Sequence, residues 1–393
     1  MKFLVFIALS SSLAQAEALR FEIQQLALDA NEGVAIADLN QDGKPDVIAG
    51  RNWYAGPDFI SRPLRSIADW NGYVESNGDF IHDMNGDGFP DVIAGSFIQT
   101  EVDWYENPGE QGLALGQQWK QHLLQDTGYS QNEGSFLRDL DENGTPEWIT
   151  NSWNNKNPLL VWQLVRGKQG GEKKVGAKPQ QADVAAMHGC TVGGDGQSHG
   201  LGFGDLNNDG REDLITGHGW YERPEKDAWT KAWTFHADWP HLHSSVPMLV
   251  RDLNADGMND LIWGKGHDYG LFWWESTGIK DGKFTWKEHL IDKSYSQPHT
   301  LHLADLDGDG QEELITGKRV RAHNGKDPGG NEPPCIYYYK WSKDDLAYTR
   351  HTIDEGRVGT GLQIATADLN GDGRIDIAVA GKSGTYVLLN QGE

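Results

Sequence analysis

The stretch DLNQDGKPDVIAG occupies residues 38–50, and a near copy, DMNGDGFPDVIAG, follows at residues 83–95. The acidic phrase that opens both stretches occurs seven times, with steps of 45 to 66 residues between successive leading aspartates. The copies begin at Asp38, Asp83, Asp139, Asp205, Asp252, Asp305 and Asp368. Regular recurrence at such a period indicates a fold built from repeated units, each of which is one small supersecondary structure.

Strand patterns surround each copy of the phrase. In the first unit GVAIAD (33–38) precedes it, while DVIAG (46–50) and the aromatic NWYAG (52–56) follow it. Most units then end in a further alternating segment, such as KEHLID at residues 287–292. Runs rich in β-branched and aromatic residues and bounded by glycine are typical of short strands. Four strands in each of seven units predict an all-β fold, a seven-bladed β-propeller with four-stranded blades.

The two ends of the chain complement each other. The last unit, from Leu362 to Asn390, has room for three strands, whereas FEIQQLAL at residues 21–28 is a strand pattern that precedes the first unit. We expect this N-terminal strand to pair into the last blade and to close the ring, because an open edge would invite aggregation. Residues 17–393 are then one domain, and its many tryptophans and tyrosines are expected to pack between blades.

The first sixteen residues, MKFLVFIALSSSLAQA, have the features of a secretory signal. Lys2 precedes an apolar run from Phe3 to Leu9, and small residues stand at Ala14 and Ala16. The run is too short to span a membrane, and no later stretch is apolar enough to do so. The sequence therefore predicts a secreted or periplasmic protein without a membrane span, which we expect to be a monomer.

Two cysteines, Cys190 and Cys335, stand far apart in segments that read as loops. In an oxidising compartment they could form a disulfide, or they could be two buried thiols. The sequence does not decide between these alternatives. The count of two excludes a framework of several disulfides.

The acidic phrase places oxygen-bearing side chains at its positions one, three, five and nine, with a glycine at position six. This spacing matches the front half of an EF-hand calcium loop, and the glycine can adopt a positive φ. Asn143 at position five of the third copy, and Glu147 and Glu313 at position nine of the third and sixth, depart from the pattern, so those two sites are expected to be weaker or empty. The alternative is an Asx-rich turn whose carboxylates accept backbone N–H groups. The candidate Ca²⁺ ligands are Asp38, Asn40, Asp42, Asp46, Asp83, Asn85, Asp87, Asp91, Asp139, Asp141, Asn143, Glu147, Asp205, Asn207, Asp209, Asp213, Asp252, Asn254, Asp256, Asp260, Asp305, Asp307, Asp309, Glu313, Asp368, Asn370, Asp372 and Asp376.

Repeated phrases of the form DxDxDGxxD followed by an aliphatic strand resemble the FG-GAP/VCBS repeats of secreted propellers, as in integrin α-subunits. The resemblance covers essentially all of the chain after residue 16, and it implies Ca²⁺ at these loops. The formal net charge of −24 argues against nucleic acid as a partner. Because many of the acidic residues lie in these loops, that charge says little about the ligand.

Basic and imidazole residues are expected at the opposite end of the strands. Because strands alternate in direction, the residues before strand one and after strand two of each unit meet around the central channel, where propellers usually bind ligands. The long insertion at residues 320–334 should overhang this mouth. His122, His236, His289 and His351 instead recur in strand four near the outer edge, and we interpret them as structural. The candidate substrate-binding residues are Arg51, His218, His241, His243, Lys265, His267, Lys318, Arg319 and Arg321.

The chain lacks the GxSxG, HExxH and P-loop motifs. Glu32 and Glu133 are the only acids of the ring, which gives weak support for a glycosidase. A mouth rich in His, Arg and Tyr better suits β-elimination from a uronate-containing polysaccharide or oligosaccharide, with His199 and His299 as base and acid and Tyr269 as an alternative acid. In architecture and residue type it resembles seven-bladed propeller lyases that act on ulvan-type and rhamnose–glucuronate linkages.

Two alternatives to that lyase remain open. The first is a dehydratase of the aldos-2-ulose type, in which an additional divalent metal at the mouth enolises a keto-sugar. Its ligands would come from His199, His218, His241, His243 or His299. The second is a non-catalytic propeller that binds or adheres to acidic glycans. Tightly held zinc would favour the dehydratase, and glycan binding without an unsaturated product would favour the binding protein.

Overall fold

The computed structural model describes residues 18–165, 186–194, 199–240 and 242–393. These residues form thirty strands, one short α-helix, α1 (Gly109–Ala114), and one 3-10 turn, η1 (Ala322–Gly325). The expected leader at residues 1–16 and His241 lie outside the described residues. None of the helices in the described part of the chain is long and apolar enough to cross a membrane.

The first half of the chain forms three four-stranded antiparallel sheets and one small hairpin. The first sheet contains β2 (Ala35–Ala37), β3 (Asp46–Ala49), β4 (Asn52–Ala55) and β5 (Ile60–Pro63). The second contains β8 (Asp79–His82), β9 (Asp91–Ala94), β10 (Glu101–Glu106) and β11 (Lys120–Asp126). The third contains β12 (Asn132–Arg138), β13 (Glu147–Ser152), β14 (Leu159–Val165) and β15 (Ala186–Gly193). Between the first two sheets, β6 (Asp69–Trp70) and β7 (Tyr73–Val74) form a separate hairpin.

The second half contains an eight-stranded sheet and two further four-stranded sheets. The eight-stranded sheet contains β16 (Leu201–Gly204), β17 (Asp213–Thr216), β18 (Gly219–Glu222), β19 (Thr234–His236), β20 (Met248–Arg251), β21 (Asp260–Gly264), β22 (Tyr269–Lys280) and β23 (Lys283–Ser296). The next contains β24 (Pro298–Ala304), β25 (Glu313–Lys318), β26 (Cys335–Ser342) and β27 (Ala347–Glu355). The last contains β28 (Ile364–Ala367), β29 (Asp376–Gly381), β30 (Gly384–Asn390) and β1 (Phe21–Ala27).

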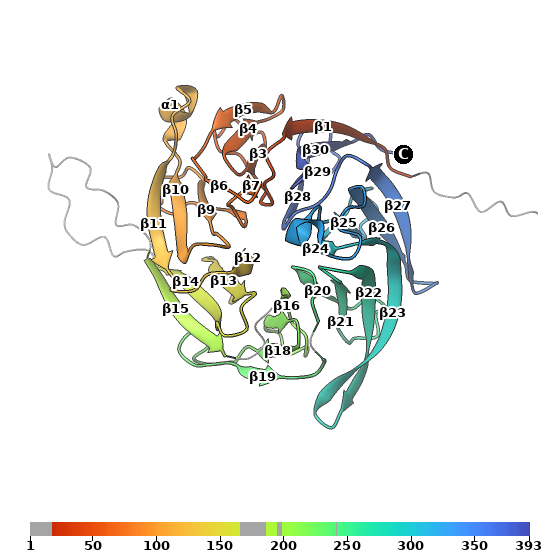
Figure 1. Ribbon diagram of the computed structural model, residues 1–393. Helices are drawn as coiled ribbons and strands as arrows, with labels where there is room; N and C mark the ends of the chain where they lie inside the picture. The colour runs from red at the N-terminus through yellow and green to blue at the C-terminus, as the bar shows by residue number, and fades with distance from the viewer. Residues whose placement is uncertain (1–17, 166–185, 195–198, 241) are drawn as a thin grey trace, which may run out of the picture.

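The sheets are arranged as a β-propeller around a central axis (Figure 1). Strands such as β12, β16, β24 and β28 lie near the axis, and β11, β15, β23 and β27 lie at the perimeter. The eight-stranded sheet consists of two antiparallel meanders joined where β16 pairs in parallel with β20. The N-terminal strand β1 pairs antiparallel with β30, from Phe21 opposite Asn390 to Ala27 opposite Thr385. The strand pattern at residues 21–28 therefore lies in the sheet that the C-terminal strands form, as expected.

The second strand of each unit is buried along its whole length, and it begins with the ninth residue of the acidic phrase. Asp46 is fully buried, yet its carboxylate accepts backbone N–H groups from Leu39 and Gly56, both at 2.9 Å. Each of the seven copies repeats the first of these bonds. The ninth-position acid thus connects the loop to the strands, because a buried carboxylate needs such partners.

The leading aspartate organises the rest of each loop. Asp38 accepts the backbone N–H groups of Asp42 at 3.0 Å and Gly43 at 2.8 Å. Gly43 at position six has a φ of 82°, as expected, and Gln41 at position four also has a positive φ, of 60°. Few residues other than glycine and asparagine adopt this conformation without strain. The local bonds of the Asx-turn interpretation are therefore present in the loops.

Aromatic side chains fill the space between neighbouring sheets, as the sequence predicted. Trp53 and Tyr105, from adjacent sheets, belong to one buried cluster. At the perimeter, histidines stack on these aromatic residues: the ring of His289 lies 4.0 Å from that of Trp273, and its Nε2 lies 2.7 Å from Glu275. His122, His236 and His351 stack in the same way. These four histidines are therefore part of the repeated packing.

The two cysteines are buried and unpaired, Cys190 in β15 and Cys335 in β26. They lie on strands and not on loops, which corrects the sequence interpretation. They belong to the third sheet and to the sheet of β24–β27, which do not adjoin in Figure 1. The structure therefore agrees with the alternative of two buried thiols.

Candidate metal centre

Each blade has an acidic-loop end and an opposite end, which we call the mouth. Strand β12 shows the geometry: it begins at Asn132 and Glu133 and ends at Arg138, directly before the acidic loop at Asp139. Glu133 therefore lies at the mouth, one strand length from the loop. His199 and His299 take equivalent positions at or just before the first strands β16 and β24.

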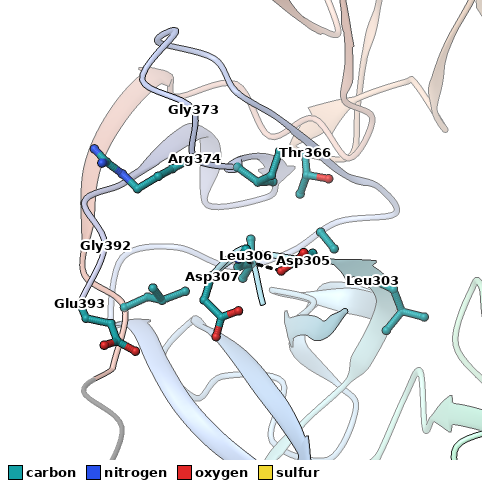
Figure 2. A pocket seen from close by; sticks show the side chains of 13 residues that line it. Leu303, Asp305, Leu306, Asp307, Thr366, Gly373, Arg374, Gly392 and Glu393 are labelled. Atoms are coloured by element: carbon teal, nitrogen blue, oxygen red, sulfur yellow. Dashed lines mark hydrogen bonds between the residues drawn. The ribbon is translucent and has the colours of Figure 1, made fainter. Parts of the chain in front are cut away.

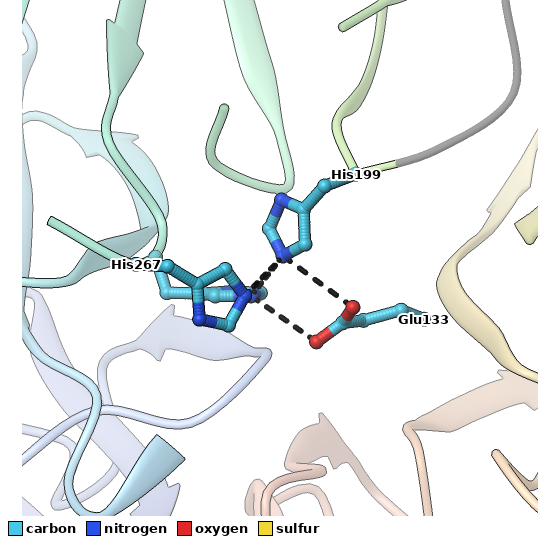
Figure 3. Close-up of side chains that lie close together, drawn as sticks. Glu133, His199 and His267 are labelled. Atoms are coloured by element: carbon cyan, nitrogen blue, oxygen red, sulfur yellow. Dashed lines mark hydrogen bonds and ion pairs between the residues drawn. The ribbon is translucent and has the colours of Figure 1, made fainter. Parts of the chain in front are cut away.

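Four side chains from different blades converge at the mouth, and we call them the histidine cluster: Glu133, His199, His267 and His299 (Figure 3). The Nε2 atom of His199 lies 2.9 Å from the Nε2 atoms of both His299 and His267. The carboxylate of Glu133 lies 3.4 Å from His199 and 3.4 Å from His299. One ligand atom from each residue lies within 4.8 Å of the other three.

Two of these rings are oriented through their Nδ1 atoms. His199 Nδ1 faces the carbonyl oxygen of Ser244 at 2.5 Å, and His267 Nδ1 faces the carboxylate of Asp327 at 2.7 Å. Because both partners are acceptors, each Nδ1 carries a proton, and the Nε2 atom of each ring points into the cluster. Lone pairs 2.9 Å apart repel each other unless a proton or a metal cation lies between them.

Protonation of His267 and His299 is disfavoured. Burial, with the charge of Arg319 next in importance, holds the pKa of His299 well below its usual value. Burial, followed by repulsion from His199, lowers the pKa of His267. Burial opposes ionisation of Glu133, but His199 and Arg319 outweigh it and keep the pKa of this carboxyl well below its usual range. The cluster therefore contains an anionic carboxylate and two imidazoles, those of His267 and His299, that favour the neutral, metal-ligating form.

A chain of buried charges adjoins the cluster. Arg319 donates to Glu133 at 2.6 Å and to Glu32 at 2.8 Å, and its Nη1 also lies 2.8 Å from His299 Nε2. Lys382 pairs with Glu32 at 2.8 Å. These two cations balance the two carboxylates, which is how buried charges are usually tolerated. Both carboxylates line a cavity at the mouth, but Arg319 pairs with each of them and Lys382 also pairs with Glu32, so neither is an unpaired acid of the kind that a glycosidase uses.

The donor set fits a divalent transition metal. Three imidazole nitrogens and one carboxylate oxygen are ligands that Zn²⁺ and its neighbours accept, whereas Ca²⁺ takes oxygen ligands. For tetrahedral geometry with bonds of about 2.0–2.1 Å, neighbouring ligand atoms stand roughly 3.3 Å apart. The closest approaches in the cluster, 2.9 to 3.4 Å, are near that spacing. The hydrogen bonds to Ser244 and Asp327 are the outer-shell contacts that orient metal-bound histidines.

The insertion between β25 and β26 is fastened over the cluster. Asp327 bonds both His267 and His323, whose rings stack with centroids 4.4 Å apart. Further along the insertion, the carbonyl oxygen of Gly329 accepts a hydrogen bond of 2.6 Å from Lys318. The expected overhang of residues 320–334 is thus held by polar contacts, one of which reaches the cluster itself.

Two cavities open at the mouth, and each is lined by a residue of the histidine cluster. The first, of about 410 Å³, is lined by His243, Lys265 and His267, among others. The second, of about 260 Å³, is lined by Glu133, Arg319 and Lys382 together with aromatic residues. Trp153 and His323 line both cavities. The cluster therefore has space beside it for a ligand.

Other residues predicted for the site lie elsewhere. Arg51 pairs with Asp29 at 2.9 Å and with Asp69 at 2.6 Å, and the hydroxyl of Tyr269 donates to Glu332 at 2.5 Å. Lys318 is buried and bonded to Ser296 and Gly329. None of these three side chains, nor that of His218, lines either cavity. Lys265, His243 and Arg321 do line a cavity, so the structure brings part of the predicted set together.

Glu133 as a metal ligand, and Asp327 and Trp153 as site residues, are not among the predictions made from the sequence. Glu133 occupies the same position relative to its acidic phrase as His199 and His299. This shared position in the repeat is the sequence signal that could have identified Glu133 as a metal ligand. Asp327 lies within an insertion whose sequence has no repeat to compare with. Its role depends on tertiary contacts.

The acidic loops form a different kind of cluster at the other end of the blades. Carboxylates gather within 4.8 Å in the third and sixth copies, at Asp139, Asp141 and Glu147 and at Asp305, Asp307 and Glu313. These are the copies with aspartate instead of asparagine at position three. A cavity of about 580 Å³ adjoins the sixth loop (Figure 2) and is lined by Asp305, Asp307 and Arg374 but by no aromatic or histidine side chain. It offers no group for proton transfer comparable to those of the mouth.

Residues 252–316 match the family model described as FG-GAP-like repeat. The fold defines the class of the protein as a β-propeller, and one segment of it carries an FG-GAP-like repeat. No curated protein matches the chain in sequence.

Three solved structures are similar in arrangement. BBS1N in complex with ARL6DN has 11% identity and a TM-score of 0.48, covering 94% of this chain and 96% of that one. The *V. cholerae* biofilm matrix protein Bap1 has 10% identity and a TM-score of 0.44, covering 98% and 90%. *Saccharomyces cerevisiae* Sqt1 has 10% identity and a TM-score of 0.48, covering 96% and 100%. At these values no activity or partner is carried over to this chain.

Proposed function

We propose that this protein is a secreted or periplasmic propeller enzyme that eliminates across a carbon–oxygen bond of an acidic carbohydrate, assisted by a divalent transition metal in the histidine cluster. The observation that supports the proposal is the convergence of three imidazole Nε2 atoms and one carboxylate in a buried setting. This observation favours the metal-dependent alternative over a mechanism in which His199 and His299 act as separate base and acid, because the Nε2 atoms of these two residues face each other.

The scaffold belongs to the same proposal. The eight-stranded sheet counts as two blades, so that with the five four-stranded sheets the propeller has seven. The pairing of β1 with β30 closes the ring, and residues 17–393 act as one monomeric domain. Ca²⁺ bound at the acidic loops stabilises the turns between the first and second strands of the blades.

Elimination needs three kinds of group. A bound divalent cation supplies Lewis acidity, which stabilises the negative charge that develops when a C–H bond beside a carboxylate or carbonyl is broken. The proton passes to a base, the carbon–carbon double bond forms, and the leaving oxygen receives a proton from the protonated base, which acts as the acid, as its bond to carbon breaks. His323 is the base that we propose, because its exposed imidazole lines both cavities and Asp327 holds its Nδ1 at 2.9 Å.

Arg319 has a defined part in this proposal. Its Nη1 lies 2.8 Å from the Nε2 of His299, and an N–H group and a metal cannot share one lone pair. Binding of the metal therefore requires the guanidinium to release His299 while it keeps Glu32 and Glu133. The positive charge then stays beside the cluster, where it continues to offset the carboxylates of Glu32 and Glu133.

Metal analysis tests the proposal directly. Protein purified with calcium present should retain about one equivalent of a transition metal, and His267→Ala should lose it while keeping the fold. With uronate-bearing polysaccharides, the metal-loaded protein should generate ultraviolet absorbance from unsaturated uronate. Metal content equal in the wild type and in His267→Ala would refute the assignment of the ligands. Glycan binding without unsaturated product would favour the non-catalytic alternative.

A further inference from the structure

All sixteen tryptophans lie in the described residues, and only two of them are exposed. Trp70 and Trp153 leave 40% and 42% of their surface accessible, while the others are buried or nearly so. Both exposed indoles line the cavities at the mouth: Trp70 lines the smaller one, and Trp153 lines both. Large exposed aromatic residues that gather at one place usually mark a binding surface.

The segment that carries Trp70 has no part in the blades. The hairpin of β6 and β7 pairs only with itself, and its Trp70 and Tyr73 rings meet edge to face at 5.2 Å. In Figure 1 this hairpin lies on the side of its blades that faces the axis. Its Asn71 contacts Asn324 of the insertion at 3.3 Å. Two segments outside the repeat therefore meet at the mouth, and the hairpin supplies the aromatic rings of Trp70 and Tyr73.

The charges that line the smaller cavity indicate the chemistry of its occupant. Arg319 and Lys382 are neutralised by Glu32 and Glu133. Arg321 is exposed, lines the same cavity, and forms no ion pair or hydrogen bond with any part of the chain that the structure describes. An unpaired guanidinium beside aromatic faces suits a ligand that joins a carboxylate or sulfate to a flat apolar surface.

Sugar rings combine these properties. A pyranose presents C–H groups on one face, which pack against an indole, while its hydroxyl groups and any carboxylate lie at the ring edge. With the two cavities meeting at Trp153, a sugar on each side of this residue would place the linkage between them next to the histidine cluster. The larger cavity, at about 410 Å³, lies within the range of about 300–1,000 Å³ usual for small-ligand sites, and the smaller one, at about 260 Å³, is just below it.

We infer that the mouth binds an internal segment of an acidic glycan, with one sugar in each cavity, Trp153 between them, and an acidic sugar of the smaller cavity bound by Arg321. The inference rests on the proposed function only for the reaction at the linkage. Binding itself requires the indoles and the guanidinium. Internal binding predicts that the enzyme acts within chains and that affinity grows with the number of sugars.

Calorimetric titration of the calcium- and zinc-loaded protein with a size series of uronate oligosaccharides, from monosaccharide to hexasaccharide, tests the inference. Affinity should rise at least 10-fold from monosaccharide to tetrasaccharide. Trp153→Ala should weaken tetrasaccharide binding about 10-fold or more, and Trp153→Phe should retain most of the affinity. Arg321→Gln should weaken binding of the uronate series and leave binding of reduced, uncharged oligosaccharides of the same length unchanged.

Trp341→Phe is the matched control, because this indole lies in β26 against Trp273, away from the mouth. Equal affinity for monosaccharide and tetrasaccharide, wild-type affinity in Trp153→Ala, or absence of binding to uronate-bearing and sulfated glycans would each overturn the inference. Tight, length-dependent binding without unsaturated product would refute the elimination and leave the inference standing. Formation of unsaturated product, together with an unchanged KM in Trp153→Ala, would support the elimination and refute the inference about binding at Trp153.

Discussion

At the scale of single residues, the geometry of the histidine cluster depends on groups that lie outside it. Asp327 bonds the Nδ1 atoms of His267 and His323, and the carbonyl oxygen of Ser244 bonds that of His199. These contacts fix which ring nitrogen carries a proton. The geometry of the cluster therefore rests on a carboxylate from the insertion and on a backbone carbonyl.

Asp327→Asn should weaken binding of zinc roughly 10–100-fold, because an amide orients His267 less strongly than a carboxylate. Competition titration against a chromophoric chelator measures this affinity. Asp268→Asn is the matched control, since its carboxylate faces Lys265 at 3.7 Å and not an imidazole. Unchanged zinc affinity in Asp327→Asn would show that the contact does not orient a ligand.

Gly266 leaves no room for a side chain beside the cluster. A Cβ atom there would lie 2.6 Å from Cε1 of His199 and 3.2 Å from Cδ2 of His299. Gly266→Ala should therefore displace these rings and lower the zinc content measured by atomic emission. Gly194→Ala, at a position with no atom within 4 Å of the added Cβ, should keep it. Full zinc content in Gly266→Ala would contradict the cluster geometry.

At the scale of elements, first strands carry polar side chains from the mouth into the core. His302 in β24 bonds Thr366 in β28 at 2.9 Å, and burial lowers its pKa to about 4. Between pH 4 and 6.5 the native state therefore binds fewer protons than the unfolded chain. This contribution to stability is complete above about pH 6.5 and is lost as the pH falls through that window.

His302→Gln should reduce the difference in unfolding free energy between pH 7 and pH 5 by roughly 1–2 kcal/mol. Urea denaturation at the two pH values measures the difference. A variant that keeps the wild-type pH dependence would show that His302 is not the group responsible.

Strand β1 pairs with β30, and we expect closure of the ring to depend on this pairing. Removal of residues 18–27 exposes the edge of β30, whose N–H and C=O groups then lack partners. The truncated protein should melt several degrees lower and form larger species in size-exclusion chromatography. Ile23→Val, which keeps the strand, is the control, and a truncated protein that stays monomeric with the wild-type melting temperature would argue against closure by β1.

At the scale of the whole molecule, metal at the acidic loops should stabilise the ring. The carboxylates at positions one and five are local acceptors already, so the folded chain prepares the loops for Ca²⁺ without needing it for each turn. An ion that binds only the native state adds about 2.7 kcal/mol per site at a concentration 100 times its dissociation constant.

Chelation with EDTA should lower the melting temperature followed by circular dichroism, and Ca²⁺ should restore it. Zn²⁺ added alone should refill the histidine cluster but recover only a small part of the loss. A melting temperature unaffected by EDTA would favour the interpretation of the loops as Asx turns that hold no metal.

The features that could be predicted from the sequence are those that recur in each repeated unit. The acidic phrase predicted the strands before and after it because burial, glycine and β-branched residues recur in every unit, and register with the phrase located His199 and His299 at the mouth. The same register did not reveal their partners. His267 and Asp327 lie in the segments that join the second and third strands of their units, where side-chain direction depends on packing that no local pattern encodes.

The sequence by itself determined the β-propeller units and their acidic loops, since these follow from local periodicity that repeats, and it predicted the end of the strands at which His199 and His299 lie. Only the tertiary structure decided that Glu133, His199, His267 and His299 form one cluster, that both exposed tryptophans line its cavities, and that Cys190 and Cys335 remain apart. The reason is physical: these groups come from distant parts of the chain, and their separations depend on how the sheets are arranged around the central axis. The acidic stretch at residues 38–50 thus specifies the scaffold, while the histidine cluster lies at the other end of the strands.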